Sequence, residues 1–374
     1  MRIVHLIYDD LQNPWLAGGG AVRAEEIYRR LAARHQVTLV SGAFPGSAPD
    51  EVRDGVRRLH VGRAASYAGS RLRYCRQALA SLNQLRWDVW VHEFSAFAPL
   101  WAPAALRRRG VLFLYHFVGA HALAKHPAVG LVSWVAEALT LRAYAHILTI
   151  APSVQREVQR RLRGRAVRVD CVFTGVDAAY FDLVPAELPF LLYLGRLDLH
   201  TKGIDLLITA FARVAGDHPE VSLKIAGRGT PRAAEAIARL ASSAGLGDRL
   251  QILGPVNEGQ KRELLRHCLA VCMPSRYEGW GIVAVEAAAA AKPVLGTCIP
   301  GLSDAVRGGE TGVLVPPGDV GALAAAMSTL LSDREQRRLL GHAGRAWARR
   351  FDWGRLAVDQ EQVLQLAAGV GIPA

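Results

Sequence analysis

The chain has 374 residues, of which 51% are hydrophobic and 21% charged, so it can bury large apolar cores and is not generally disordered. Its five cysteines are scattered and complete neither a zinc motif nor an even disulfide framework, which indicates inert thiols in a reducing compartment. The net charge is +12, and residues 1–170 hold the whole excess, with 24 Lys/Arg against 12 Asp/Glu.

Apolar runs of strand length alternate with helical patterns along the first half of the chain. These runs are RIVHLIY (2–8), QVTLVSG (36–42), DVWVHE (88–93), VLFLYHF (111–117), HILTIAP (146–152) and VRVDCVF (167–173). Because continuous apolar strands separated by helices are typical of parallel sheets covered on both faces, this half predicts one doubly wound α/β domain.

The second half repeats the alternation with another six runs. They are FLLYLGR (190–196), VSLKIAG (221–227), LQILG (250–254), LAVCMPS (269–275), PVLGT (293–297) and GVLVPPG (312–318). We therefore expect two Rossmann-like domains, residues 1–175 and 185–351, joined by a turn-rich segment at 175–189. An isolated helix in 353–374 should pack back on the first domain. Since ligands bind at the carboxyl ends of parallel strands, we expect two facing sheets with the site in the cleft between them.

The N-terminus enters a strand at once, which argues against a signal peptide. The longest apolar segment, 128–147, is interrupted by Glu137 and Arg142, so we expect no membrane-spanning helix and a cytoplasmic protein.

The glycine run Gly18-Gly19-Gly20 follows the first strand and precedes a helix, where backbone can approach a ligand closely. Arg23 stands where a dinucleotide fingerprint needs Gly or Ala, so the run fails as an NAD motif and an ordinary glycine-rich connector remains the alternative. His116 ends a predicted strand and should lie at the cleft rim, although a single histidine is more often structural.

Two basic residues, Arg196 and Lys202, follow the first strand of the second half. Next to glycines, at the carboxyl end of a doubly wound sheet, they favour diphosphate binding over two separate surface charges.

Two carboxylates flank a Gly-Trp-Gly turn in YEGWGIVAVEAAAAA. Glu278 lies in the loop, while Glu286 is the only polar residue from Ile282 to Ala291. An unpaired buried carboxylate is unfavourable, so Glu286 needs either a ligand hydroxyl or a partner. The alternatives are a sugar hydroxyl beside a phosphate bound at Gly281–Val283, or a structural ion pair with Lys292 or an arginine.

These residues together resemble the retaining glycosyltransferases of family 4, which have the GT-B fold. The resemblance rests on Glu278-x7-Glu286 in EGWGIVAVEA, with KPV, GVLVPPGD, YLGR…KG, TGVDAAYF, IAGRG, GGGAVR and FDW in order along almost the whole chain. Thr174 replaces the usual Asn before Gly-Val-Asp, which casts little doubt on activity.

The resemblance implies transfer of a hexose-type sugar from a nucleotide diphosphate sugar, with retention, without a metal or other cofactor, and by displacement on one face of the sugar. The double-displacement route through a carboxylate is the alternative mechanism. Asn257 in PVNEG leans toward a UDP-sugar over a GDP-sugar. A catalytically silent nucleotide-sugar-binding scaffold and an NAD-dependent oxidoreductase are the alternative functions.

Carried over residue by residue, the resemblance assigns catalysis to His116, Arg196, Lys202 and Glu278, with Arg196 and Lys202 on the diphosphate and His116 near the transferred sugar. Glu286 would hold the ribose hydroxyls. The remaining implied nucleotide-sugar contacts are Gly19, Gly20, Gly195, Gly227, Val256, Asn257, Gly279, Trp280, Gly281 and Ile282.

The acceptor would be a glycan, a lipid-linked molecule or a small molecule, bound by the first domain. Arginines gather at Arg71, Arg73 and Arg76, at 107–109 and at 156–165, and Leu72, Cys75 and Leu79 share one face of the first of these segments. This pattern predicts a basic helix that rests on the inner face of an anionic membrane, with solvated arginines as the alternative. No aromatic-interleaved basic platform or recognition helix points to nucleic acid.

Overall fold

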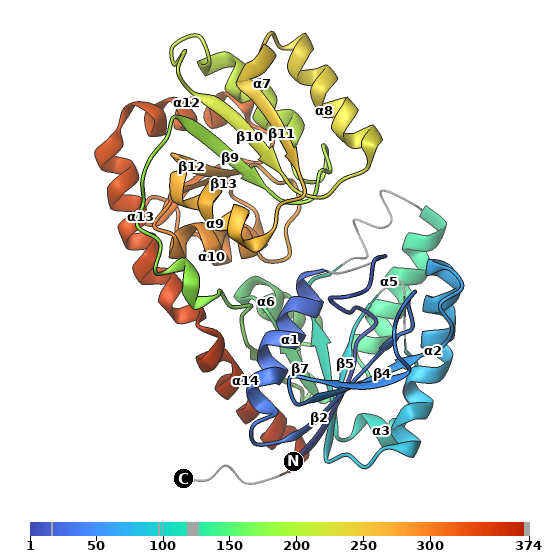
Figure 1. Cartoon of the computed structure of the whole chain (residues 1–374). Helices are drawn as coiled ribbons and strands as arrows, with labels where there is room; N and C mark the ends of the chain where they lie inside the picture. The colour runs from blue at the N-terminus through green and yellow to red at the C-terminus, as the bar shows by residue number, and fades with distance from the viewer. Residues whose placement is uncertain (16–17, 96–97, 99, 118–126, 370–374) are drawn as a thin grey trace. The chain divides into compact units, whose positions relative to one another are not determined.

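The computed structural model describes residues 1–15, 18–95, 98, 100–117 and 127–369. The chain divides into two compact units (Figure 1). Unit 1 comprises Met1–Thr174 and Trp353–Ala374, and unit 2 comprises Gly175–Asp352. Each unit is an α/β body around one sheet, as the sequence pattern predicts.

Unit 1 contains an eight-stranded sheet in the order β3-β4-β2-β1-β5-β6-β7-β8. All neighbouring pairs are parallel except β3 with β4. The elements are β1 (Arg2–Leu6), α1 (Gly19–Leu31), β2 (Gln36–Gly42), β3 (Asp50–Arg53), β4 (Val56–Val61), α2 (Tyr67–Gln84), β5 (Val89–Glu93), α3 (Ala104–Arg107), β6 (Gly110–Leu114), α5 (Pro127–Leu141), β7 (His146–Thr149), α6 (Pro152–Arg161), β8 (Arg168–Cys171) and α14 (Trp353–Ala368).

The structure contains the hairpin β3–β4, which is not among the six strands that the sequence predicted for the first half. Its sequence DEVRDGVRRLHV carries too many charges to form a continuous apolar run. The turn is made by Asp54 and Gly55, both with positive φ (52° and 76°), which is the geometry of a tight Asp-Gly hairpin. The Asp-Gly pair was therefore the signal for this hairpin.

Arg23 explains why the glycine run is not a dinucleotide fingerprint. Its side chain is 1% exposed. The guanidinium lies 4.6 Å from the centre of the Phe113 ring and donates to the carbonyls of Val172 and Phe173 and to Gln360 Oε1. Arg23 thus connects α1 with the end of the β8 segment and with α14, which packs against α1.

Unit 2 contains a six-stranded parallel sheet in the order β11-β10-β9-β12-β13-β14. Its elements are η1 (Ala178–Tyr180), β9 (Phe190–Leu194), α7 (Ile204–Val214), β10 (Ser222–Ala226), α8 (Pro231–Ser243), η2 (Gly247–Arg249), β11 (Leu250–Gly254), α9 (Glu258–His267), β12 (Ala270–Met273), α10 (Ile282–Ala289), β13 (Val294–Thr297), α11 (Pro300–Ala305), β14 (Gly312–Val315), α12 (Val320–Ser332), α13 (Arg334–Ala348) and η3 (Arg349–Phe351). All six strands predicted for this half are present. The strand order reverses between β9 and β12, so a ligand-binding crevice is expected at their carboxyl ends.

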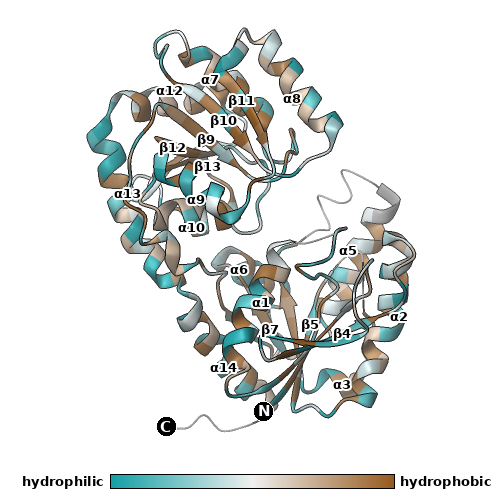
Figure 2. Cartoon of the chain, in the orientation of Figure 1, coloured by the Kyte–Doolittle hydropathy of each residue, from teal (hydrophilic) through white to brown (hydrophobic). Residues whose placement is uncertain are grey.

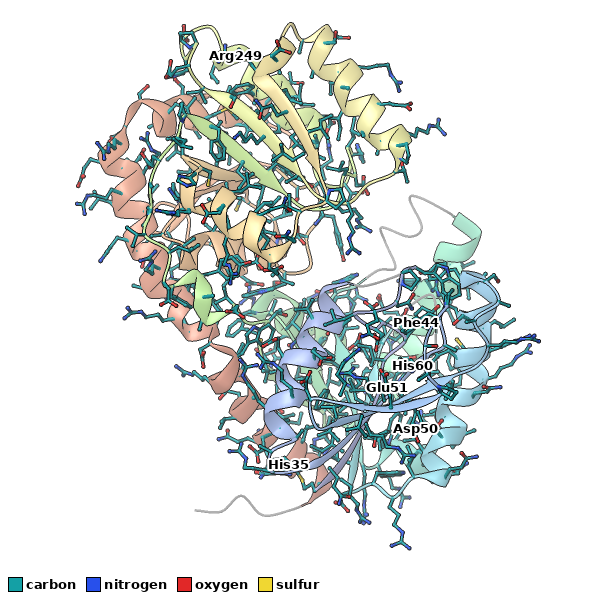
Figure 3. All side chains as sticks on the ribbon, viewed as in Figure 1. His35, Phe44, Asp50, Glu51, His60 and Arg249 are labelled. Carbon is teal, nitrogen blue, oxygen red and sulfur yellow. The ribbon has the colours of Figure 1, made fainter. Side chains whose placement is uncertain are left out.

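The core of unit 2 lies between this sheet and the flanking helices, and the strands β9, β10 and β11 are strongly hydrophobic in Figure 2. Arg249, labelled in Figure 3, closes one edge of this core by donating to the carbonyls of Ala215, His218 and Val221. Since each of these carbonyls ends a helical or turn segment, one guanidinium satisfies several backbone acceptors.

Within the residues that the structure describes, no helix is both long and apolar enough to cross a membrane.

Candidate functional site

The switch point of unit 2 brings together the loops after β9 and β12. Arg196 follows β9 by two residues, is exposed, and has no ion pair among the described residues. Lys202 lies at the end of the same loop, just before α7, and its Nζ is 2.7 Å from Glu278 Oε2 in the loop after β12. The two loops therefore meet through a pair of predicted site residues. Arg196 is open to an anion, and Lys202 already has a carboxylate partner.

Close backbone packing fixes these loops. Gly203 has a φ of 68°, and a Cβ there would lie 1.9 Å from the Pro274 carbonyl oxygen. Gly227, after β10, has a φ of 146°, and a Cβ there would lie 1.7 Å from the carbonyl oxygen of Gly195. No side chain fits at either position, so Gly195 and Gly227 help to shape this edge of the sheet through their backbone.

The segment from Gly279 to Ile282 leads into α10. The Trp280 side chain is 5% exposed and contacts the Phe351 ring edge-on at 5.3 Å, so the indole belongs to the core. Ile282 N–H donates to the Trp280 carbonyl, and Gly281 is the N-cap without a side-chain cap. The remaining N-terminal amides of α10 form an electropositive end beside Glu278.

Glu286 is partnered by a lysine other than the one considered from the sequence. Its Oε1 accepts from Lys261 Nζ at 2.7 Å, whereas Lys292 has no hydrogen-bond partner among the described residues. Glu286 is 7% exposed, and its Oε2 is buried without a hydrogen-bond partner among the described residues. Burial raises the pKa of the Glu286 carboxyl, and the Lys261 ammonium opposes this rise. Glu286 is thus in an ion pair and still offers one oxygen to a donor.

Lys261 was missed by sequence reasoning, and it organises the surroundings of Glu286. It also contacts Glu258 at 3.2 Å and lies 5.4 Å from the centre of the Tyr180 ring. Tyr180 O–H donates to Glu258 Oε2 at 2.8 Å, so the motif TGVDAAYF is anchored on α9. Although burial lowers the pKa of Lys261, Glu286 and Glu258 outweigh that effect and the net pKa is raised. No local pattern marks Lys261, because α9 and α10 meet only in the folded unit.

Asn257 and Val256 lie between β11 and α9. The Asn257 side chain accepts from Gln260 N–H at 2.9 Å, and Gln260 Oε1 accepts from Asn257 N–H at 2.9 Å, which makes a capping box. The side-chain Oδ1 of Asn257 therefore caps the N-terminus of α9.

In unit 1, the predicted residues Gly19 and Gly20 begin α1, close to the carboxyl ends of β1, β5 and β6. A Cβ on Gly20 would lie 3.0 Å from Glu93 Oε1 and 3.3 Å from the Tyr115 hydroxyl. Gly18 N–H donates to Asp9 Oδ2 at 2.9 Å. Burial raises the pKa of Asp9 to about 7.

His116 follows β6 by two residues and is half-buried. It lies beside Tyr115 in the chain, so it belongs to the same edge of the sheet. Asp9, Glu93 and Tyr115 are polar residues of this edge that the sequence analysis did not single out. The signal for them was their position just after a predicted strand or at its end.

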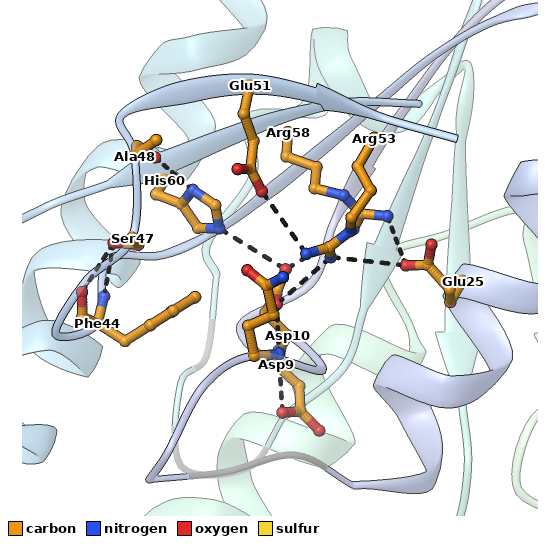
Figure 4. A network of polar contacts seen from close by, with 11 residues as sticks. Asp9, Asp10, Glu25, Phe44, Ser47, Ala48, Glu51, Arg53, Arg58 and His60 are labelled. Atoms are coloured by element: carbon orange, nitrogen blue, oxygen red, sulfur yellow. Dashed lines mark hydrogen bonds and ion pairs between the residues drawn. The ribbon is translucent and has the colours of Figure 1, made fainter. Parts of the chain in front are cut away.

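A second polar cluster in unit 1 fixes the loop after β1 to the hairpin β3–β4 (Figure 4). Arg58 Nη2 donates to Glu25 at 2.5 Å, and Asp10 lies 3.6–3.7 Å from His60, Arg58 and Arg53. Arg58, Asp10 and His60 are each less than 10% exposed. Hydrogen bonds and attraction between opposite charges within the cluster offset the desolvation of these groups, so the cluster has a structural role.

Comparison with known proteins adds two family matches. Residues 182–347 match the model described as glycosyl transferases group 1, and residues 17–180 match the model described as glycosyltransferase family 4. The two models together cover most of both units.

Relatives and solved structures agree with these matches. The chain is 29% identical to a glycogen synthase of Mycobacterium tuberculosis over 97% of this chain and 94% of the relative. It is 32% identical to a phosphatidyl-myo-inositol mannosyltransferase of Mycolicibacterium smegmatis over 62% of this chain and 61% of the relative.

Two solved structures share the fold. Sucrose-phosphate synthase from Thermosynechococcus elongatus has a TM-score of 0.81 at 22% identity and covers 98% of this chain and 99% of its own. Anabaena HepE in complex with UDP and glucose has a TM-score of 0.73 at 18% identity and covers 98% and 100%. The chain belongs to glycosyltransferase family 4, and it is a GT-B glycosyltransferase that uses a nucleotide sugar.

Proposed function

We propose that this enzyme transfers a hexose-type sugar from a UDP-sugar to a hydroxyl of a glycan or lipid-linked acceptor, with retention and without a metal ion. The observation that best supports the donor site is the meeting of Arg196, Lys202, Glu278 and the start of α10 at the switch point of unit 2. One uncompensated guanidinium and a helix N-terminus suit a diphosphate.

Glu286 gives a second contact to the same ligand. Its Oε2 is a buried acceptor without a donor, and the two ribose hydroxyls are donors of suitable chemistry. UDP is favoured over GDP because solved relatives in this fold carry UDP or UDP-sugars, including HepE and an Escherichia coli trehalose-6-phosphate protein with UDP-2-fluoroglucose.

The proposed reaction needs no enzyme nucleophile. The acceptor oxygen bonds to the anomeric carbon as the bond from that carbon to the β-phosphate oxygen breaks. The acceptor's proton passes to the leaving phosphate on the same face. Arg196 stabilises the charge that develops on the diphosphate, and the Lys202 ammonium adds to this if the donor displaces Glu278. Near His116 and Glu93, the carboxyl edge of unit 1 offers polar groups to the acceptor.

Calorimetry with UDP-, GDP- and ADP-sugars tests the donor, and the anomeric configuration of the product tests retention. We expect Arg196→Ala to weaken UDP-sugar binding or turnover about tenfold or more, because it removes a charge-assisted contact. Arg239→Ala is the matched control, because that side chain is 69% exposed on α8. Tight binding of a GDP-sugar alone, or activity lost with EDTA and restored by Mg²⁺ or Mn²⁺, would contradict the corresponding part of the proposal.

We also propose that the enzyme acts at an anionic membrane surface, since unit 1 holds the excess of positive charge.

A further inference from the structure

Helix α5 of unit 1 exposes most of its large apolar side chains and buries several polar ones. Three of the side chains it turns toward the unit are polar, since Ser133, Glu137 and Thr140 are 1%, 2% and 4% exposed, and the apolar Ala136 (1%) and Leu141 (2%) are buried beside them. Positions spaced by three and four residues lie on one helix face, so Ser133, Glu137 and Thr140 share the inner side. A surface helix ordinarily buries an apolar stripe instead.

The outer side of α5 is apolar. Its exposed residues are Leu131 (52%), Val132 (65%), Trp134 (47%), Val135 (42%) and Leu139 (53%). From Leu131 to Leu139 the only charged residue is Glu137, which is buried. We call these five exposed residues the α5 face. A contiguous exposed apolar patch of this kind marks an interaction surface.

An ion pair holds α5 in this orientation. Glu137 Oε1 lies 2.9 Å from Arg161 Nη1 on the neighbouring helix α6, and the carboxylate is almost fully buried. Rolling the helix to bury its apolar side would break this ion pair, although Arg161 would keep its second partner, Glu157, at 2.7 Å. The buried Glu137–Arg161 pair therefore favours the orientation in which the α5 face is exposed.

Positive charge borders the α5 face. Arg142 is exposed immediately after the helix, and the exposed Arg165 donates from its guanidinium to the Arg142 carbonyl at 3.0 Å. Neither arginine has an acidic partner among the described residues. An apolar helix face with a tryptophan and with arginines at its end matches the chemistry of a headgroup boundary rich in anionic lipids.

We propose that the α5 face docks unit 1 on an anionic lipid bilayer, with Arg142 and Arg165 at the headgroups. The helix has 15 residues, so at about 1.5 Å per residue it lies along the interface and does not span the bilayer. This inference rests on the proposed action at a membrane and names the surface that performs it.

The α5 face replaces α2 as the main docking surface. In α2, Arg71 stacks on the rings of Tyr8 and Tyr67, and only Leu72 among its large apolar residues is more than half exposed. The exposed Arg73 and Arg76 can add attraction to anionic lipid, but α2 offers little apolar area to insert.

The test is flotation of the full chain with phosphatidylglycerol-containing vesicles and with phosphatidylcholine vesicles. We expect wild type to float with the anionic vesicles. The triple variant Leu131→Gln/Val135→Gln/Leu139→Gln should lose about tenfold or more of its partitioning, because glutamine keeps helix propensity but removes the apolar contact. The matched control is Leu339→Gln/Val358→Gln, which changes two apolar residues of similar exposure (55% and 43%) on α13 and α14 and should float like wild type.

Two further measurements separate the outcomes. Arg142→Glu/Arg165→Glu should weaken flotation, and added salt should weaken wild-type flotation in the same direction. Unchanged flotation of the triple variant would overturn the proposal, and so would a wild-type dimer that becomes monomeric in the triple variant without any vesicle binding. Hydrolysis of UDP-glucose in solution should stay the same in the triple variant. If wild type floats but neither hydrolyses nor binds UDP-glucose, the donor assignment fails while the docking surface stands.

Discussion

The buried pair Lys261–Glu286 permits a prediction that separates a ligand-binding carboxylate from a purely structural one. Glu286→Gln keeps the size of the side chain but removes its charge. If Oε2 accepts a hydroxyl of the nucleotide, the variant loses a charge-assisted hydrogen bond of about 1.5–3 kcal/mol. This corresponds to about 10- to 150-fold weaker binding of UDP-glucose.

Glu258→Gln is the control for that measurement. Glu258 also contacts Lys261, but its side chain is 71% exposed, so the ion pair contributes little. We expect its affinity for UDP-glucose to stay within about twofold of wild type, in line with a contribution of a few tenths of a kcal/mol.

Lys261→Met adds a pH test of the same reasoning. Burial raises the pKa of Glu286 and Lys261 lowers it, so removing the lysine raises that pKa further. A protonated carboxyl is a weaker acceptor, and the affinity of Lys261→Met for UDP-glucose should therefore rise as the pH rises and the carboxyl ionises. Wild type should show a smaller dependence over the same interval.

Isothermal titration calorimetry at several pH values measures both effects. UDP-glucose suits the test because its diphosphate diester keeps the same charge between weakly acidic and weakly basic pH. Equal affinity of wild type and Glu286→Gln at every pH would refute the role of Glu286 in holding the donor. A pH-independent Lys261→Met would refute the electrostatic part of the argument.

Two further predictions concern stability. Gly203→Ala should destabilise unit 2 by about 3 kcal/mol or more, because the new Cβ would lie 1.9 Å from the Pro274 carbonyl oxygen at a φ of 68°. Gly216→Ala is the control and should have little effect, because the space around its Cβ is open. Equal melting temperatures for the two variants would contradict this prediction. His92 is fully buried, and its burial, with a smaller effect of His5, lowers its pKa to about 3 from 6.5, so its contribution to stability is complete above about pH 6.5 and is lost as the pH falls toward 3. The loss amounts to up to about 5 kcal/mol. The free energy of unfolding, measured with urea, should therefore fall less steeply with decreasing pH in His92→Gln than in wild type; identical slopes would exclude His92 as a source.

The sequence predicted unit 2 well because its strands are continuous apolar runs, which differ clearly from the helices between them. The expectation that ligands bind at the carboxyl ends of parallel strands also placed Arg196, Lys202 and Glu278 at one edge of the unit 2 sheet. It could not predict that Lys202 and Glu278 contact each other, since side-chain pairing depends on the paths of two loops that are 76 residues apart.

The parts that could not be predicted are set by contacts between distant segments. Glu286 demanded a partner, but Lys261 belongs to a helix whose packing no local pattern describes. For the apolar segment 128–147 the sequence argued only against a membrane-spanning helix; it could not show that Leu131 and Leu139 are exposed while Glu137 is buried against Arg161 of another helix. The Asp54-Gly55 pair was a local signal for the hairpin β3–β4, but the charged residues around it hid the alternating pattern of its strands.

The backbone junction between the loops after β9 and β12 has a consequence for affinity. Besides the contact at Gly203, the Thr201 carbonyl accepts from Arg276 N–H at 3.0 Å, and the Arg276 guanidinium binds Asp205. Residues held this way have little conformational freedom left to lose, so a nucleotide sugar bound at the proposed donor site would meet a preformed surface. Less of the donor's binding energy is then used to order the loops, so more of it can stabilise the transition state of the transfer. Donor preference should therefore change more readily on substitution of side chains such as Arg196 than on redesign of either loop.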